Sequence, residues 1–313
     1  MKKSILMLGV SMVALASCSN EEVTEVASNR AIRFDQFVNN NTRSVNELSG
    51  INNFYVFGKA GEADVFVNER NTVVKYWEVS KTYNFAAYAD GEDGKLDNVS
   101  YDLESKSLKF TSYTPNDAKD LIAAVSAEIV TGDNVTSQAK VDLPFKHLLS
   151  QVKFTFTTPE AADYTIAISN IKFNAVQTAD CNYSQAGAVW TGDTKGDYIF
   201  EAIDDIANEE GKAFCNSKLV IPQAGTDAIS VTFTATMSGA GLETKTKEFT
   251  ATLAVAENIA GGTSAVNTWM PGYRYNYTAE ITAEKINSEL KKIEFNPTVG
   301  GWENANDTDT EAQ

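Results

Sequence analysis

Hydrophobic and polar positions alternate in short runs along most of this chain. Residues 54–57, 83–88 and 152–156 are clear examples, and turn residues such as those at 90–94 separate the runs. Alternation with a period of two is typical of a strand that buries one face. No amphipathic pattern longer than a few helical turns stands out, although residues 202–210 are compatible with a short helix. The pattern therefore predicts an all-β protein made of β-sandwiches.

The length of the chain predicts two domains. It has 313 residues, of which 43% are hydrophobic, and a single core rarely grows beyond about 250–300 residues. The run at 141–156 joins the two halves, and Pro144 within it marks a strand entry or an edge. We expect an N-terminal sandwich over residues 44–147 and a C-terminal sandwich over residues 148–313.

The first residues have the pattern of an export signal. Lys2 and Lys3 precede an apolar run at 5–15, which is too short to span a bilayer. Small residues then lead directly to Cys18. This order predicts a lipoprotein signal over residues 1–18, with a lipid attached to the Cys18 sulfur. The alternative is an ordinary secretory signal with an incidental cysteine.

A tether and a single strand follow the signal. Residues 19–29 are polar and acidic, and such a segment has too little apolar surface to offset the entropy of ordering it. Residues 31–38 are rich in aromatic and β-branched side chains and predict one strand. Its large apolar side chains include Ile32, Phe34 and Phe37.

The polar loop at 39–44 contains a candidate proteolytic site. Exposed loops of small polar residues are preferred sites of cleavage, which makes the Arg43–Ser44 bond the expected cut. Arg30 and Arg33 are alternatives. We prefer Arg43 because only a cut after it releases a whole strand.

The C-terminal segment carries large apolar side chains that have to be buried. They precede a polar, acidic end at 303–313, and they are Ile293, Phe295, Val299 and Trp302. Such a segment packs either on its own domain or in another molecule.

The cysteines and the single histidine limit which disulfides and metal sites this chain could form. Past Cys18 only Cys181 and Cys215 remain, and in an exported protein such a pair could form a disulfide. Closing a loop of that length contributes about 3.5 kcal/mol. Two separate buried thiols are the alternative, and the bridge is only slightly favoured. The single histidine, His147, lacks the partners of a metal site, so we expect neither a metal nor another cofactor.

The charge and the acidic pairs argue against two classes of function. Lys and Arg number 26 and Asp and Glu number 42, which gives a net charge of −16. An acidic protein repels phosphate backbones, so nucleic acid is not an expected partner. Acidic pairs occur at 204–205 and 209–210. Adjacent carboxylates point to different sides, unlike the facing pair of a glycoside hydrolase, and we expect no catalytic residues.

Several motifs, in their order along the chain, together resemble the fimbrillin family, the type V pilins of Gram-negative anaerobes. The motifs are the small residues before Cys18, the strand at 31–38, Arg43 in its loop, the segments at 145–152, 218–223 and 269–275, and the tail at 293–302.

The resemblance implies a fold and an assembly mechanism. The fold is two transthyretin-like, Greek-key β-sandwiches in tandem. The precursor is an outer-membrane lipoprotein, and an arginine-specific protease cuts it in the loop after the first strand. Residues 19–43 then hold the tether and the removable strand with Ile32, Phe34 and Phe37. The C-terminal segment at about 286–302 is the donor strand, which fills the vacated groove of the neighbouring fimbrial subunit.

The resemblance leaves a second role open. A related protein that keeps its lipid would serve as a fimbrial anchor or tip, or as a glycan-binding adhesin that contacts host or bacterial surface receptors. The expected location in both cases is the outer membrane or the fimbrium. The two roles differ in whether the chain is cut after Arg43 and in whether the tail is free to donate.

Overall fold

The computed structural model describes residues 30–38, 53–91, 94–117, 119–135, 138–159, 164–253, 267–288 and 291–301. The predicted all-β class is confirmed, because strands dominate these residues, and the helices whose bounds lie within them are short, η1 (Thr226–Ala228) and α2 (Ala283–Asn287). Neither of these turns has the length or the apolar character of a membrane span. Residues 202–210 form a loop instead of the short helix considered above.

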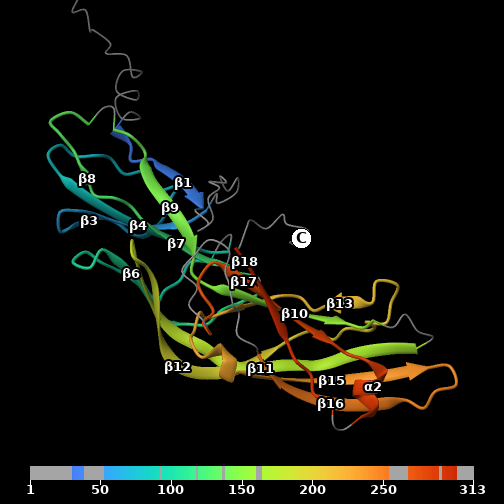
Figure 1. Ribbon diagram of the computed structural model, residues 1–313. Helices are drawn as coiled ribbons and strands as arrows, with labels where there is room; N and C mark the ends of the chain where they lie inside the picture. Colours follow the sequence, from blue (N-terminus) through green and yellow to red (C-terminus); the bar gives the residue numbers. More distant parts are fainter. Residues whose placement is uncertain are drawn as a thin grey trace, which may run out of the picture.

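The strands form three sheets, which the topology of the described residues defines (Figure 1). The N-terminal sheet contains, in spatial order, β1 (Phe34–Val38), β9 (Val141–His147), β7 (Leu121–Val125), β4 (Thr82–Asp90), β2 (Tyr55–Ala60) and β3 (Ala63–Arg70), with β8 (Ile129–Val130) beside β4. The C-terminal sheet contains β13 (Lys212–Phe214), β10 (Ser150–Thr157), β17 (Tyr273–Glu280) and β18 (Asn296–Gly301), with β14 (Lys218–Val220) beside β10.

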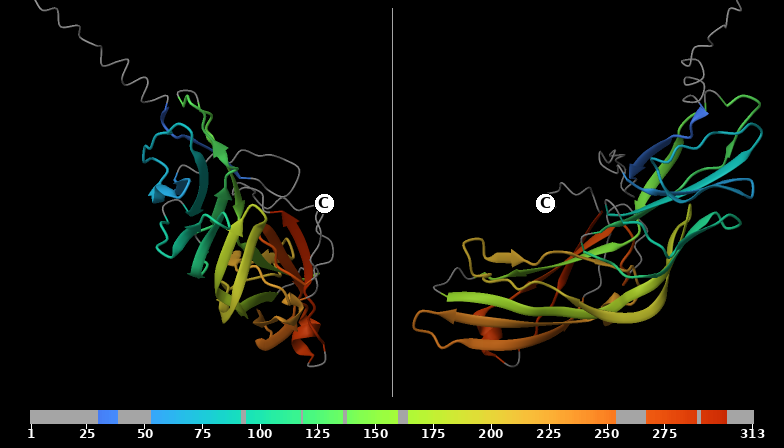
Figure 2. Two further views of the ribbon diagram at one scale, coloured as in Figure 1. Left: turned by 90° about the vertical axis from the view of Figure 1, so that its left-hand side faces the viewer. Right: turned by 180° about the vertical axis from the view of Figure 1, so that it is seen from behind.

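The third sheet, here called the spanning sheet, runs along both halves of the molecule. Its order is β16 (Lys245–Thr252), β15 (Ser230–Gly239), β11 (Tyr164–Ser184), β6 (Ser107–Tyr113) and β5 (Val99–Asp102), with β12 (Gly187–Ile199) beside β11. The first half of β11 pairs with β15, and its second half pairs with β6. One long strand therefore belongs to both halves, and the molecule is elongated (Figures 1 and 2).

Three apolar cores fill the space between these layers. The N-terminal core contains Phe54, Phe66, Phe85 and Phe145. The junction core lies between the N-terminal sheet and the end of β11, and it includes Tyr88, Phe110, Leu148 and Cys181. The C-terminal core, between the C-terminal sheet and the start of β11, includes Phe154, Phe156, Phe233 and Phe295.

Strand β4 is buried on both faces. Tyr83, Phe85 and Ala87 point into the N-terminal core, and Ala86 and Tyr88 point into the junction core. The alternation of large and small side chains therefore reports a strand that serves two cores, and not a strand with one wet face. Packing against β4 leaves little room at Gly58 on β2, where an added Cβ would lie 2.8 Å from Phe85 Cδ1.

The turn between β9 and β10 lies where the chain passes from the N-terminal to the C-terminal sheet. His147 Nδ1 lies 2.5 Å from Asp120 Oδ2, and the Leu149 carbonyl accepts a hydrogen bond from Gly272 N at 2.8 Å. The boundary at 147–148 falls in this turn, although β6 and β11 pair across it. The division into domains at 44–147 and 148–313, and their transthyretin-like character, stay predictions.

The expected disulfide between Cys181 and Cys215 is not formed. Both thiols are free and buried. Cys181 belongs to the junction core and Cys215 to the C-terminal core, so the two side chains serve different packing clusters. Burial raises the pKa of Cys181 to about 12 and that of Cys215 to about 11.

The tight packing at Gly58 predicts a large effect of one methyl group. Gly58→Ala should lower the free energy of unfolding by about 1–3 kcal/mol, because the added methyl group would press on Phe85 and Phe66, which are both packed in the N-terminal core. Gly132→Ala is the matched control, since an added Cβ there meets nothing within 4 Å. Urea unfolding of both variants measures the difference. Equal stability of the two variants would contradict this account of the packing.

The free thiols predict slow reactivity. Both cysteines of a chain that lacks Cys18 should react with a thiol reagent at pH 8 only after unfolding, because burial keeps them protonated and inaccessible. Mass spectrometry of the alkylated protein, native and in denaturant, counts the modified thiols. If the two cysteines of the denatured protein can be alkylated only after reduction, they form a disulfide and this account is wrong.

Candidate functional site

The N-terminal strand covers one edge of the N-terminal sheet. Strand β1 pairs in parallel with β9, in a register that runs from Phe34 opposite Val141 to Val38 opposite Phe145. Both ribbons lie side by side in Figures 1 and 2. Because β1 has no partner on its other side among the described strands, it is an edge strand.

A second ladder holds the residues just before β1. Ile32 N donates to Lys75 O and Trp77 N donates to Arg30 O, each at 2.9 Å. The Arg30 guanidinium adds a hydrogen bond from Nη2 to Trp77 O at 3.1 Å. Residues 30–38 are thus fixed twice, to residues 75–77 and to β9.

Aromatic packing adds to these hydrogen bonds. Ile32 is buried in the N-terminal core, and Phe34 packs against it. The Phe34 ring meets three rings edge-on, with centroid distances of 5.9 Å to Phe54, 5.6 Å to Phe66 and 5.8 Å to Phe85. Edge-to-face pairs of this kind are each worth about 0.5–1.5 kcal/mol beyond burial. We call the surface under residues 30–38 the aromatic trough, with Phe54, Phe66 and Phe85 as its floor.

Strand β9 is paired with β1 alone over most of its length. Pro144 lies on β9 opposite Phe37, and proline is found in sheets chiefly at edges because it cannot donate to a ladder. Strand β9 pairs with β7 only through His147 and Lys146. Over residues 141–145, β9 therefore becomes an edge strand whenever β1 is absent.

The structure accounts for part of the predicted N-terminal site. It places Ile32 and Phe34 together over the trough, and it places the backbone of Phe37 in β1. The Phe37 side chain, Cys18, Arg43 and Ser44 lie outside the described residues. The sequence did not show which residues receive the strand. The sequence signal for them is the set of aromatic residues just before β2, in β3 and in β4.

The C-terminal strand forms an edge of the C-terminal sheet. Strand β18 pairs antiparallel with β17, from Asn296 opposite Thr278 to Gly301 opposite Tyr273. Its exposure alternates, with Val299 half-buried against the C-terminal core. Trp302 lies outside the described residues.

Two of the predicted donor residues are core anchors. Ile293 is 6% exposed and Phe295 is 1% exposed. The Phe295 ring lies 5.2 Å from that of Phe154 and 6.0 Å from those of Phe156 and Phe233. The predicted segment is therefore divided, with a fixed base up to Phe295 and an edge strand after it.

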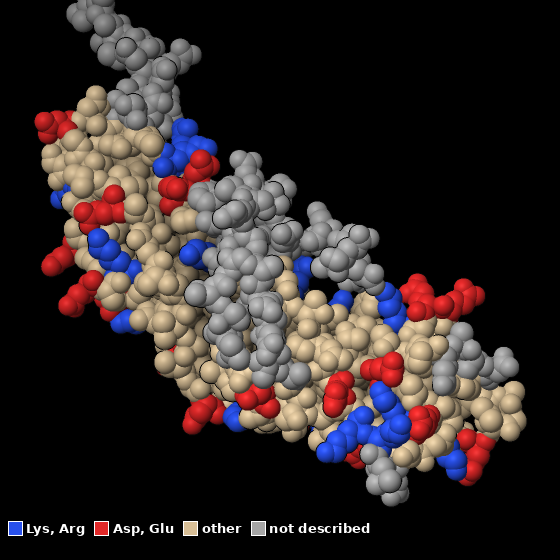
Figure 3. All heavy atoms as spheres, in the orientation of Figure 1, with Lys and Arg blue, Asp and Glu red and all other residues tan. Residues whose placement is uncertain are grey.

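Asp205, one member of the acidic pairs, has a structural role. Asp205 Oδ1 accepts hydrogen bonds from Ile166 N at 3.0 Å and from Ala207 N at 2.8 Å, so it caps a turn. No group of three or more metal-ligating side chains occurs in the described ranges. On the face shown in Figure 3, acidic and basic side chains are interspersed without a continuous basic surface.

Comparison with known proteins assigns the family. The family described as Fimbrillin-like matches residues 24–302, which is most of the chain, and the protein belongs to that family. Membership makes it a structural or adhesive protein of cell-surface fimbriae, with other fimbrial subunits as partners, and points away from an enzyme. No curated protein matches the sequence significantly.

Solved structures include proteins of similar shape. A candidate cell adhesion protein from Bacteroides uniformis is 18% identical, with a TM-score of 0.48 over 88% of this chain and 98% of that one. The fimbrial anchor protein Mfa2 from Porphyromonas gingivalis is 11% identical, with a TM-score of 0.41 over 87% of this chain and 96% of that one. The family assignment rests on the sequence match.

Because the tail is divided in this way, shortening a side chain should affect stability differently on the two sides of the division. Phe295→Ala should lower the free energy of unfolding by about 3–5 kcal/mol, because it opens a cavity among three aromatic rings. Val299→Ala, in the half-buried edge strand, should cost about 1 kcal/mol or less. Thermal and urea unfolding of both variants tests this. Similar losses at both positions would mean that β18 belongs to the core as firmly as its base does.

Proposed function

We propose that this protein is a polymerising fimbrial subunit whose first strand is removed by an arginine-specific protease and replaced by the C-terminal segment of the next subunit. The observation that carries the proposal is the position of β1, an edge strand laid in parallel on β9 over the aromatic trough. A lipid on Cys18 would hold the precursor at the outer membrane until the cut.

Loss of residues 30–38 would leave unpaired backbone groups and exposed aromatic rings, which another strand could cover. The backbone groups of β9 and of residues 75–77 would lose their partners, and the rings of the trough would face water. An incoming strand satisfies the ladder and fills the trough with alternate side chains. Each large apolar side chain buried there contributes about 1.5–3 kcal/mol before ordering costs.

The contacts of the N-terminal arginines support a cut at Arg43–Ser44. The backbone carbonyls of Arg30 and Arg33 accept hydrogen bonds from Trp77 N at 2.9 Å and from Val141 N at 2.7 Å. A protease needs an accessible extended backbone, which these ladders deny it. Arg43 follows β1 in the sequence, so a cut there frees the whole strand.

The burial of Phe295 supports the proposal that the donor segment starts at β18. Phe295 stays in the C-terminal core, and the residues after it form an edge strand that can separate from β17 at the expense of one ladder. Trough and donor are different surfaces, so the contact is head-to-tail, does not close and generates a filament.

A lipid-retaining anchor or tip adhesin is the second candidate. The observation that favours it is the pairing of β18 with its own sheet through six residue pairs, from Asn296–Thr278 to Gly301–Tyr273. An anchor would keep this pairing, and it would keep β1 in place.

Proteolysis of the purified chain that begins at Ser19 separates these candidates. Treatment with an arginine-specific protease should give a new N-terminus at Ser44 and then a ladder of oligomers on a detergent gel, because each vacated trough takes a donor. Arg43→Lys should abolish both the cut and the ladder. N-terminal sequencing and intact mass identify the product.

Arg33→Lys is the matched control and should be cut and polymerise as the parent chain does. A chain that is cut at Ser44 yet stays monomeric would favour the anchor or tip. Ladders formed by the uncut Arg43→Lys chain would refute activation by cleavage.

A further inference from the structure

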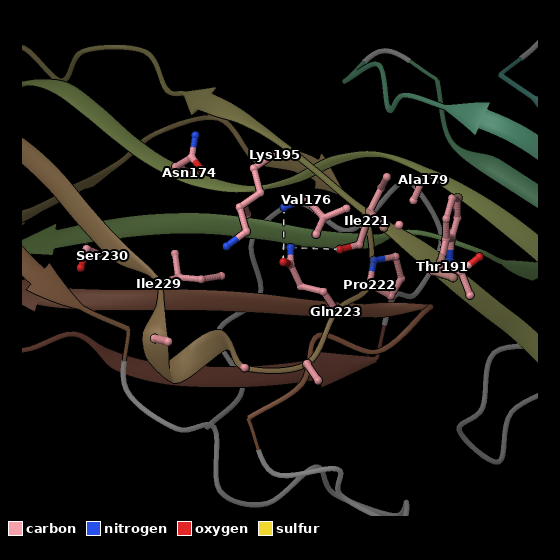
Figure 4. A pocket seen from close by; sticks show the side chains of 16 residues that line it. Asn174, Val176, Ala179, Thr191, Lys195, Ile221, Pro222, Gln223, Ile229 and Ser230 are labelled. Carbon is pink, nitrogen blue, oxygen red and sulfur yellow. Dashed lines mark hydrogen bonds between the residues drawn. The ribbon is translucent and has the colours of Figure 1, made fainter.

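A pocket of about 490 Å³ lies in the C-terminal half, away from the trough and from β18. One wall is the β11–β12 hairpin, and the other is the connection from β14 through η1 to the start of β15 (Figure 4). Ligand pockets commonly measure about 300–1,000 Å³. The size suits a single small ligand unit.

Irregular pairing in the hairpin shapes the wall. The register of β11 and β12 shifts between Val176 and Thr178 and again between Thr178 and Asp180. Gly192 has φ +144°, and a Cβ there would lie 3.1 Å from Ala179 Cα. Bulges of this kind re-aim side chains and are often found beside binding sites.

Gln223 presents a fixed amide at the pocket wall. Its Oε1 accepts a hydrogen bond from Val176 N at 3.3 Å, and its Nε2 donates to Ile221 O at 3.5 Å. Its backbone carbonyl accepts from Trp269 N at 2.9 Å. The side chain is therefore positioned before any ligand arrives, and an amide can still accept and donate further hydrogen bonds.

Lys195 supplies a positive charge at the opening. Its exposed side chain extends from β12 and points toward the Gln223 amide (Figure 4). The residues that line the pocket include no carboxylate. On the same strand, Asp197 interacts with Asn174 Nδ2 at 2.7 Å and with Lys172 Nζ at 3.8 Å, and it is not a lining residue.

Trp190 gives the pocket a rigid apolar flank. It is half-buried, its Nε1 donates to Leu148 O at 2.9 Å, and its ring lies 5.9 Å from that of Tyr113. Ile221 and Pro222 continue the apolar lining. A pre-positioned aromatic surface avoids part of the entropy cost of binding.

We propose that this pocket binds a carboxylated sugar unit, such as a uronic acid. The hydroxyls of a sugar match the amides and hydroxyls of the wall, its C–H face matches the indole and proline, and its carboxylate pairs with Lys195. A neutral sugar lacks the last contact, and a simple carboxylate lacks the first two. The proposal does not depend on strand exchange, so either one can fail alone.

Calorimetry and amide NMR on the chain that begins at Ser19 test the assignment, with sodium glucuronate as the probe. Glucuronate should bind saturably and shift the amide signals of residues 190–195, 221 and 223–225. Lys195→Gln should weaken binding at least about ten-fold, because a charge-assisted hydrogen bond is lost. Glucose and acetate should each bind more weakly than glucuronate by a similar factor.

Lys245→Gln is the control for net charge. Lys245 lies on β16, 2.7 Å from Glu243, and outside the pocket, so this variant should bind as the parent does. The proposal is overturned if glucuronate does not bind, or if Lys195→Gln binds it unchanged. It is also overturned if acetate or a glutamate-containing dipeptide binds as tightly as glucuronate, since the site would then recognise any carboxylate or a peptide.

Discussion

The docking of residues 30–38 on the aromatic trough is the interaction on which the N-terminal half of this structure depends. It completes the ladder of β9 and of residues 75–77, and it covers Phe54, Phe66 and Phe85. A strand that meets both needs is strongly held, yet it lies at the edge of its sheet. Residues 30–38 are therefore both an edge of the sheet and a part of the core.

The two halves of the molecule are joined by packing as well as by the chain. Strand β11 contributes to the C-terminal core with its first half and to the junction core with its second half. Lys218 Nζ lies 2.5 Å from Asp117 Oδ2, and Trp190 donates to Leu148 O. Continuous strands and shared cores tie the two halves together more firmly than a flexible linker would.

The pocket beside β12 differs in charge from the acidic protein as a whole. The net charge of −16 and the interspersed charges on the face in Figure 3 favour solubility of the monomer. Against this background the pocket beside β12 is distinct, because a lysine, a fixed amide and an indole converge there without a carboxylate in the lining. The pocket and the two edge strands β1 and β18 lie on different elements.

The sequence by itself determined the strand class, the first strand with Ile32 and Phe34, and the apolar character of the tail. These are local properties, because a period of two and β-branched or aromatic content depend only on neighbours in the chain. Tertiary structure alone decided the partners. It paired β1 with β9 instead of with a strand nearer in the sequence. It also assigned Cys181 and Cys215 to separate cores, and it divided the tail at Phe295 into a buried base and an edge strand. Pairing between distant strands depends on which faces meet in space, and no local pattern encodes that choice.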